Sequence, residues 1–142
     1  MPLRASHLFQ QPIIKTDPNS GPASFTVAAG NTLKRGDPVY HIAATNEVAL
    51  ADAAALATSA WIGVVDDDSV RLAGEQVAVR LVGIVPGAFA GFTPGGDIWL
   101  KVGGGLTQNL SFGNNEVIAI VGTADSATDL VLYSGLPELI EV

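Results

Sequence analysis

The chain has 142 residues, no cysteine and a net charge of −7, and only 6% of its residues are aromatic. This length suits a single domain, and the lack of cysteine excludes disulfides and thiolate metal sites. No apolar run reaches the roughly 18 residues of a membrane span, and the N-terminal residues lack the apolar stretch of a secretory signal. We therefore expect a soluble protein that is made in the cytoplasm and does not bind membranes.

The charge is unevenly distributed along the chain. Residues 1–35 carry a net charge of +3, whereas residues 36–142 carry −10. An acidic body argues against nucleic acid as a partner, because phosphate binding needs clustered lysine and arginine. A basic N-terminal segment suits docking onto an acidic protein surface or onto a neighbouring copy. Ordinary solvation of four scattered charges is the alternative.

Residues 1–24 are predicted to form an extended N-terminal arm. Four prolines are spread over this segment, and each removes a backbone donor and disfavours helix at the residue before it. Phe9, Ile13 and Ile14 lie in the arm without a local core. We expect these side chains to dock on the same chain or on a partner, because a free disordered segment favours fewer apolar residues.

Residues 25–135 are predicted to form one β domain. A turn at Gly36-Asp37 leads into the first clear strand, and the alanine-rich stretch 51–60 predicts either a short helix or a surface loop. The expected strands in this part of the chain are Pro38–Ala43, Val48–Leu50 and Trp61–Val65.

The stretch Gly74–Thr107 reads as two strands around a glycine- and proline-rich corner, similar to a hairpin. Apolar residues alternate with a period of two in both strands, which is typical of half-buried antiparallel strands. The residues expected on one face are Val77, Val79 and Leu81 in the first strand, and Ile98, Leu100 and Val102 in the second.

The last third of the chain adds two more predicted strands and a tail. Val117–Ala124 is apolar at successive positions, so we expect this strand to be covered on both faces. Leu130–Tyr133 is the last predicted strand, and residues 136–142 form either an edge strand or a packing tail. Strands that recur every 10–15 residues indicate an all-β fold, either a barrel or a sandwich.

The sequence shows no catalytic constellation, cofactor motif or metal-ligand spacing. His7 and His41 lie on different elements, and a half-buried, hydrogen-bonded histidine is the simplest interpretation of His41. Asp66–Asp68 is the densest acidic cluster; it predicts a solvated turn, with a calcium site as the alternative. Like charges at this spacing are expected to raise the pKa of at least one carboxylate. A small enzyme or metal-binding barrel would have to combine this cluster with His41.

The segment Gly103–Gly105 and the tripeptide Arg35-Gly36-Asp37 resemble known functional motifs, but turns explain both more simply. No P-loop and no nucleophile elbow is present, and Gly103–Gly105 predicts a tight turn with positive φ. Arg35-Gly36-Asp37 spells an adhesion tripeptide. Short matches of this kind occur by chance, and Gly36-Asp37 already has a role in a turn.

Three aromatic residues are candidates for an oligomer interface. The alternation places Trp99 on the face opposite Ile98 and Leu100, so its side chain is expected to be partly exposed or buried by a partner. Phe89 and Phe92 lie in the corner of the same region. Large aromatic side chains outside the core are frequent at stable interfaces; the alternative is that they cap the open end of their own barrel.

The order of these segments resembles the family of small phage capsid cement, or decoration, proteins. The matching segments are GDPVY (36–40), IGVV (62–65), GEQVAVRLVGIVPG (74–87), TPGGDIWLKVGGGLT (93–107), VIAIVGTA (117–124) and LVLY (130–133). The resemblance implies a compact antiparallel, β-tulip-like domain that forms a homotrimer on the outer surface of the virion. Such a protein clamps adjacent subunits of the major capsid protein.

The resemblance also implies where the functional residues lie. The arm would rest on the capsid, and sister subunits would meet at the aromatic residues named above. The arm residues expected to bind the capsid are Arg4, Phe9, Ile13, Ile14 and Lys15. A trimeric phage spike or fibre module that binds a host receptor or glycan is the alternative function.

Overall fold

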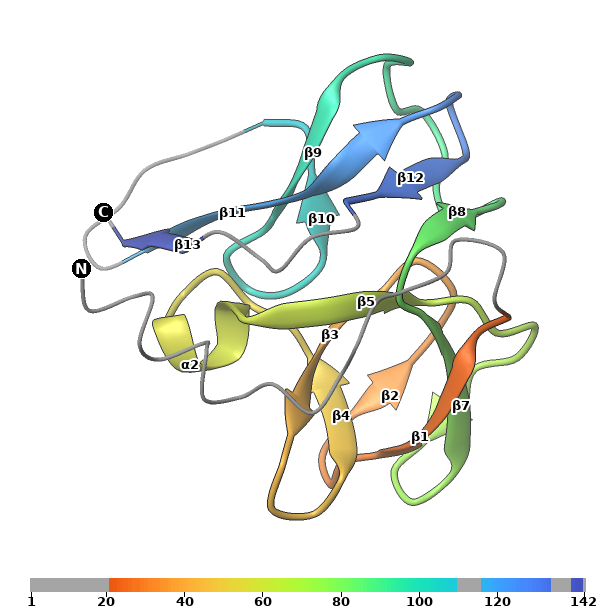
Figure 1. The fold of residues 1–142 in the computed structure, drawn as a ribbon, viewed down its shortest axis with the longest axis vertical. Coiled ribbons are helices and arrows are strands. Elements are labelled where there is room, and N and C mark those ends of the chain that lie inside the picture. Colours follow the sequence, from red (N-terminus) through yellow and green to blue (C-terminus); the bar gives the residue numbers. More distant parts are fainter. Residues whose placement is uncertain (1–20, 110–115, 134–138, 142) are drawn as a thin grey trace.

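A computed structural model describes residues 21–109, 116–133 and 139–141, and nearly all of their regular structure is β-strand (Figure 1). The expected all-β class with little helix is thus confirmed. The strands form a closed five-stranded barrel, a second sheet above it in Figure 1, and a separate two-stranded sheet. The sequence left barrel and sandwich open, and the structure combines a barrel with a second sheet.

The barrel closes in the order β1-β4-β3-β5-β7. Its pairs are antiparallel except that β1 runs parallel to β4, with Thr26 opposite Glu47. The barrel is thus antiparallel, as expected, apart from this one parallel pair. The barrel strands are β1 (Ala23–Val27), β3 (Pro38–Ile42), β4 (Glu47–Leu50), β5 (Trp61–Val65) and β7 (Gln76–Arg80).

The second sheet has the order β10-β9-β11-β12-β8, and β13 also pairs with β11. β12 pairs with Gly122–Ala124, and β13 pairs with Val117–Ala119, so the two strands occupy successive parts of β11. The sequence predicted either an edge strand or a packing tail for residues 136–142, and β13 is that edge strand. The strands are β8 (Gly83–Val85), β9 (Asp97–Leu100), β10 (Leu106–Thr107), β11 (Val117–Ala124), β12 (Leu130–Leu132) and β13 (Leu139–Glu141).

The remaining elements are short. β2 (Thr32–Leu33) pairs with β6 (Arg71–Leu72), and helix α2 (Leu56–Ser59) follows β4. The alanine-rich stretch thus forms a helix only in its second half. Within the described residues, no helix has the length and hydrophobicity needed to cross a membrane.

The barrel and the second sheet are joined through β5, whose side chains alternate between two hydrophobic cores. Trp61 and Val64 are fully buried in the core beneath the second sheet, whereas Val65 is fully buried inside the barrel. The register of β5 against β3 shifts between Val39 and Tyr40. Because one strand contributes to both cores, the barrel supports the second sheet.

The stretch Gly74–Thr107 does not form the expected hairpin. β7 pairs with β1 and β5 in the barrel, whereas β9 pairs with β10 and β11 in the second sheet. Val77, Val79, Ile98 and Leu100 are buried as predicted, but Val102 is 39% exposed. The reason is that β9 ends at Leu100 and the chain then turns through glycines with φ of 94–99°, a region that favours glycine.

Candidate interaction face

The inner face of the second sheet packs on the barrel, and its outer face carries apolar side chains. Along β9, Ile98 and Leu100 are buried while Asp97 is exposed and Trp99 is half-buried. Trp99 lies opposite Ile120 of β11, so both point to the outer side of the sheet. The predicted alternation around Trp99 is thus present in the structure.

Strands on the other side of β11 extend this surface. Val131 of β12 lies between Thr123 of β11 and Ile84 of β8, and Ile84 is 47% exposed. Tyr133, which donates its backbone N–H to the carbonyl of Val121, is 44% exposed. We call this surface the outer face and define it by its apolar members Ile84, Trp99, Ile118, Ile120, Val131 and Tyr133.

The expectation that β11 is covered on both sides holds for one side only. Its buried residues alternate with Ile118, Ile120 and Thr123, which are half-buried. A sheet face with several partly exposed apolar side chains is a candidate interaction site. The signal was present in the sequence as two isoleucines spaced by two within Val117–Ala124, but the sequence alone did not show which face was open.

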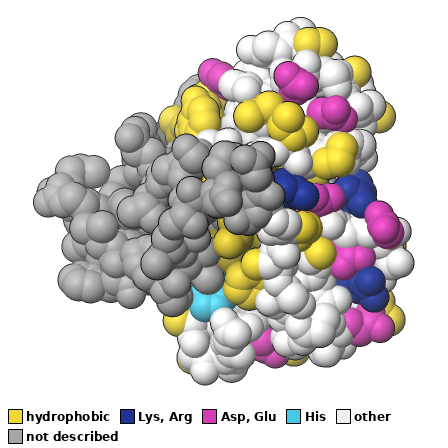
Figure 2. Space-filling view, turned by 45° about the vertical axis from the view of Figure 1, so that its right-hand side comes forward, with side chains coloured by type: hydrophobic (Ala, Val, Ile, Leu, Met, Phe, Trp, Pro, Cys, Tyr) yellow, Lys and Arg dark blue, Asp and Glu magenta, His cyan; other side chains and the backbone are white. Residues whose placement is uncertain are grey.

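One end of the outer face is bordered by carboxylates. Asp97 begins β9 and lies opposite Thr123, and Asp125 and Asp129 belong to the turn between β11 and β12. Asp97 and Asp125 are exposed, and a hydrogen bond from the Gly87 backbone N–H lowers the pKa of Asp129. We call these three residues the acidic rim. Hydrophobic and acidic side chains are mixed over the upper part of the molecule, where the second sheet lies (Figure 2).

Phe89 and Phe92 lie away from the outer face, in the loop between β8 and β9. Their ring centroids are 4.3 Å apart, and both side chains pack against the core beneath the second sheet. The loop is held by hydrogen bonds from the backbone N–H groups of both residues to the carbonyls of Thr128 and Ala127. Both phenylalanines therefore pack against apolar side chains of their own chain, whereas Trp99 is only half-buried.

Asp66 is a buried partner of two arginines, so the acidic cluster is not the solvated turn expected from sequence. Its side chain is 8% exposed and accepts hydrogen bonds from Arg35 and from Nε of Arg80, the latter at 2.7 Å. Asp68 is 98% exposed and accepts a hydrogen bond from Arg35 at 2.7 Å. The two arginines come from the turn before β3 and from β7, so the ion pairs hold these elements together.

Asp67 organises the turn between β5 and β6. Its carboxylate accepts hydrogen bonds from the backbone N–H groups of Ser69 and Ala78, at 3.1 and 3.0 Å, and from Arg71 at 3.0 Å. The Arg71 side chain is the main cause that lowers the pKa of Asp67 from 3.8 to about 2, with the two backbone donors contributing. For this residue, the shift is opposite in direction to the one expected from neighbouring like charges.

The adhesion tripeptide is part of a structural turn. Arg35 binds Asp66 and Asp68, and Asp37 accepts hydrogen bonds from the backbone N–H and the Nζ of Lys34, both at 2.9 Å. Gly36 has φ of +94°, and a Cβ atom there would lie 2.4 Å from the carbonyl oxygen of Ala88. The two charged side chains of the motif are thus bound within the chain, and its glycine is required for packing.

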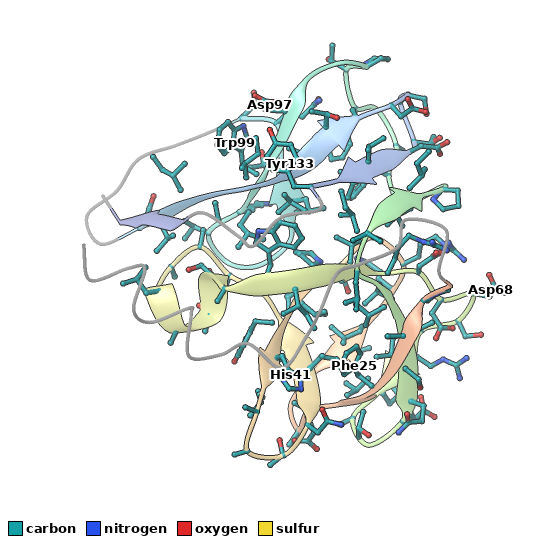
Figure 3. All side chains as sticks on the ribbon, in the orientation of Figure 1. Phe25, His41, Asp68, Asp97, Trp99 and Tyr133 are labelled. Atoms are coloured by element: carbon teal, nitrogen blue, oxygen red, sulfur yellow. The ribbon has the colours of Figure 1, made fainter. Side chains whose placement is uncertain are left out.

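His41 and the acidic cluster do not form a common site. His41 lies on β3, 2.7 Å through Nε2 from Oδ1 of Asn46 and edge-on to Phe25. In Figure 3, Asp68 lies at the right-hand edge of the barrel, well apart from His41. No group of three or more histidine, aspartate or glutamate residues in the described part of the chain is arranged to hold a metal ion.

A shallow groove lies between the two-stranded sheet and the β9–β10 turn. It has a volume of about 380 Å³ and is lined by Leu50, Val70, Gly104 and the Lys34–Asp37 ion pair, among others. Its two charged side chains, Lys34 and Asp37, are paired with each other, so the groove offers no unpaired acid or base.

The arm residues predicted to bind a capsid (Arg4, Phe9, Ile13, Ile14 and Lys15) lie outside the described residues. Trp99, Asp97 and Tyr133 all lie on the second sheet (Figure 3). The described residues thus define a small β protein with a partly exposed apolar sheet face. No protein-family model, curated protein or solved structure matches the chain.

Proposed function

We propose that this chain is a structural protein of a virus particle, a capsid cement protein that binds as a trimer to the outside of a phage head and links adjacent major capsid subunits. The observation that carries the proposal is the outer face: six apolar residues on one side of a sheet, bordered by carboxylates. A surface of this kind is suited to protein–protein contact.

The polar groups support a structural role. The carboxylates of the acidic cluster accept hydrogen bonds from arginines or backbone N–H groups, and these pairs connect elements of the same chain. Such pairs hold the fold together, and they occupy the carboxylates of this cluster with structural contacts. The segment order that resembles cement proteins points in the same direction.

The physical mechanism is multivalent binding. A trimer presents each contact three times, and linked contacts gain affinity through their effective concentration. Because the contacts exist only on the assembled shell, binding stabilises that shell by mass action. A modest contact per copy is then sufficient to hold the particle together.

Co-sedimentation with purified expanded heads of the phage that encodes the chain tests this proposal. We expect saturable binding and heads that resist a higher temperature before they release their DNA. Heads that sediment without the protein, at concentrations where the protein is an oligomer, would refute the cement function. Bovine serum albumin of equal mass concentration is the control for trapping.

A trimeric spike or fibre module that binds a host glycan is the second candidate. The half-buried Trp99 on the outer face favours it, because an indole ring can stack on a sugar. The adhesion tripeptide gives it no support, since Arg35 and Asp37 are bound within the chain. Binding to a glycan array that is lost in Trp99→Ala, without binding to heads, would favour this function.

A further inference from the structure

We propose that residues 1–20 of one copy, which make up most of the predicted N-terminal arm, lie across the outer face of a neighbouring copy, so that exchanged arms join the copies into a ring. This inference rests on the self-association that the proposed function requires. It assigns the arm to a sister copy, whereas the resemblance to cement proteins would place it on the capsid.

The outer face has the properties of a surface that is covered in the assembled state. Ile84 and Tyr133 leave almost half of their surface exposed in the single chain, and Trp99 and Ile120 lie between them and β10. Single exposed apolar side chains are ordinary in soluble proteins. Several on one sheet face indicate a partner.

The chemistry of the arm matches this surface. Residues 8–14 contain Leu8, Phe9, Ile13 and Ile14, with Arg4 before them and Lys15 after them. The apolar stretch suits the centre of the outer face, and the cation at one end of the stretch suits the acidic rim. The four basic residues of the segment 1–35 fall into two pairs. Lys34 and Arg35 are bound to Asp37, Asp66 and Asp68 of their own domain. Arg4 and Lys15 are the basic residues of the arm itself.

The arm is long enough to reach a second copy. Twenty residues precede Gly21, and an extended chain of this length spans about 70 Å, whereas a folded chain of 142 residues has a diameter of about 40 Å. β1 begins at Ala23, which lies opposite Val79 near the end of β7. After β7, the chain continues into β8 of the second sheet. The arm thus starts where the barrel meets the second sheet.

The proposed contact joins two different surfaces, the arm of one copy and the outer face of the next. Contacts between unlike surfaces generate rings when the rotation between copies closes. Three copies form the smallest ring in which each arm and each face serves a different neighbour. This arrangement therefore gives a physical basis for the trimer.

Complementation between two full-length variants tests the proposal. The arm variant carries Phe9→Ser, Ile13→Ser and Ile14→Ser, and the face variant carries Trp99→Glu; Tyr133→Glu serves if Trp99→Glu does not fold, as judged by circular dichroism. By light scattering we expect wild type at about three times 14.6 kDa and each variant near 14.6 kDa. In a 1:1 mixture the intact arm of one variant meets the intact face of the other, so we expect pairs near twice that mass. Val70→Glu, at an exposed residue of the groove, is the matched control and should keep the wild-type mass.

Three results would overturn the inference. A monomeric wild type excludes arm exchange. An arm variant that keeps the wild-type mass shows that the copies meet without the arm. A mixture that stays monomeric shows that the arm and the outer face are not each other's partners, as when the arm covers the face of its own chain.

The failure of this inference is distinguishable from that of the cement function. Heads that bind a monomeric arm variant as tightly as wild type refute arm exchange and leave the cement function standing. A wild-type trimer that requires the arm but binds no heads refutes the cement function and leaves arm exchange standing.

Discussion

The indole Nε1 of Trp61 donates a hydrogen bond of 3.1 Å to the backbone carbonyl of Ile120. Trp61 belongs to the barrel and is fully buried, and Ile120 lies in β11, where the register against β9 shifts between Ile120 and Gly122. An irregular ladder leaves backbone groups in need of other partners. The barrel thus supplies a side-chain donor to the sheet that carries the outer face.

Trp61→Phe is expected to lower the free energy of unfolding. The substitution removes the donor and leaves a carbonyl without this hydrogen bond, which costs about 1–3 kcal/mol, in addition to lost packing. Chemical denaturation followed by far-UV circular dichroism measures the change. Trp99→Phe is the matched control, because Trp99 is half-buried on the outer face, and it should change the stability of the monomer much less. Equal losses in both variants would show that the hydrogen bond contributes nothing specific.

Asp67 is expected to make the folded state sensitive to acid. Its pKa is lowered to about 2 in the folded protein, so the unfolded chain binds a proton first as the pH falls. The contribution of Asp67 to the free energy of unfolding is therefore fully present above pH 3.8 and is lost as the pH falls from 3.8 to about 2. Asp67→Asn should lower stability at neutral pH by about 1–3 kcal/mol, and the difference from wild type should shrink over this pH range. Asp68→Asn, at a side chain that is 98% exposed, is the control. A difference that does not change with pH would contradict the assignment.

Gly122→Ala is expected to prevent folding of the second sheet. A Cβ atom at Gly122 would lie 1.9 Å from the carbonyl oxygen of Val131, which is backbone and cannot move aside without disrupting β12. Gly91→Ala is the control: it meets no atom within 4 Å and carries only the strain of its φ of +85°, about 1 kcal/mol. Soluble yield and the dispersion of amide NMR signals compare the two. A folded Gly122→Ala protein with wild-type stability would show that β11 and β12 are further apart than described.

Arg35→Lys tests whether the adhesion tripeptide is structural. Lysine cannot hold Asp66 and Asp68 at once with two separate nitrogens, as Nη1 and Nη2 of Arg35 do. Asp66 keeps Arg80 as a partner, so we expect the loss of about one hydrogen bond to a charged group, about 1.5–3 kcal/mol, in thermal or chemical unfolding. Integrin-type cell adhesion should be absent in wild type and in the variant alike. Adhesion by wild type that the variant loses, with unchanged stability, would reverse this assignment.

Local features of the fold could be predicted from the sequence because they depend on neighbouring residues. The predicted bounds of Trp61–Val65 and Val117–Ala124 match β5 and β11, since continuous apolar or alternating runs define such strands. The half-buried position of Trp99 followed from the alternation along β9. The face of β11 that stays open depends on which strands stack beneath it, which no local pattern contains.

Features that depend on distant pairing could not be predicted. The division of Gly74–Thr107 between two sheets reflects the pairing of β7 with β1 and of β9 with β11. The acidic cluster was expected to be solvated because its arginine partners are remote in sequence: Arg35 and Arg80 lie 31 and 14 residues from Asp66. Charge content alone does not show which cation reaches a buried carboxylate.

The two tryptophans offer a direct measurement of whether the outer face becomes covered. With 5-fluorotryptophan incorporated, the protein should give two ¹⁹F resonances, assigned with Trp99→Phe. Trp61 is fully buried, so its resonance should show no solvent isotope shift between H₂O and D₂O at any concentration. If a neighbouring copy covers the outer face in the proposed trimer, Trp99 should show the shift in the dilute, dissociated protein and lose it at concentrations where copies associate, because the partner would exclude water. If Trp99 is already protected in the monomer, its cover comes from its own chain, and the neighbouring copy must bind elsewhere.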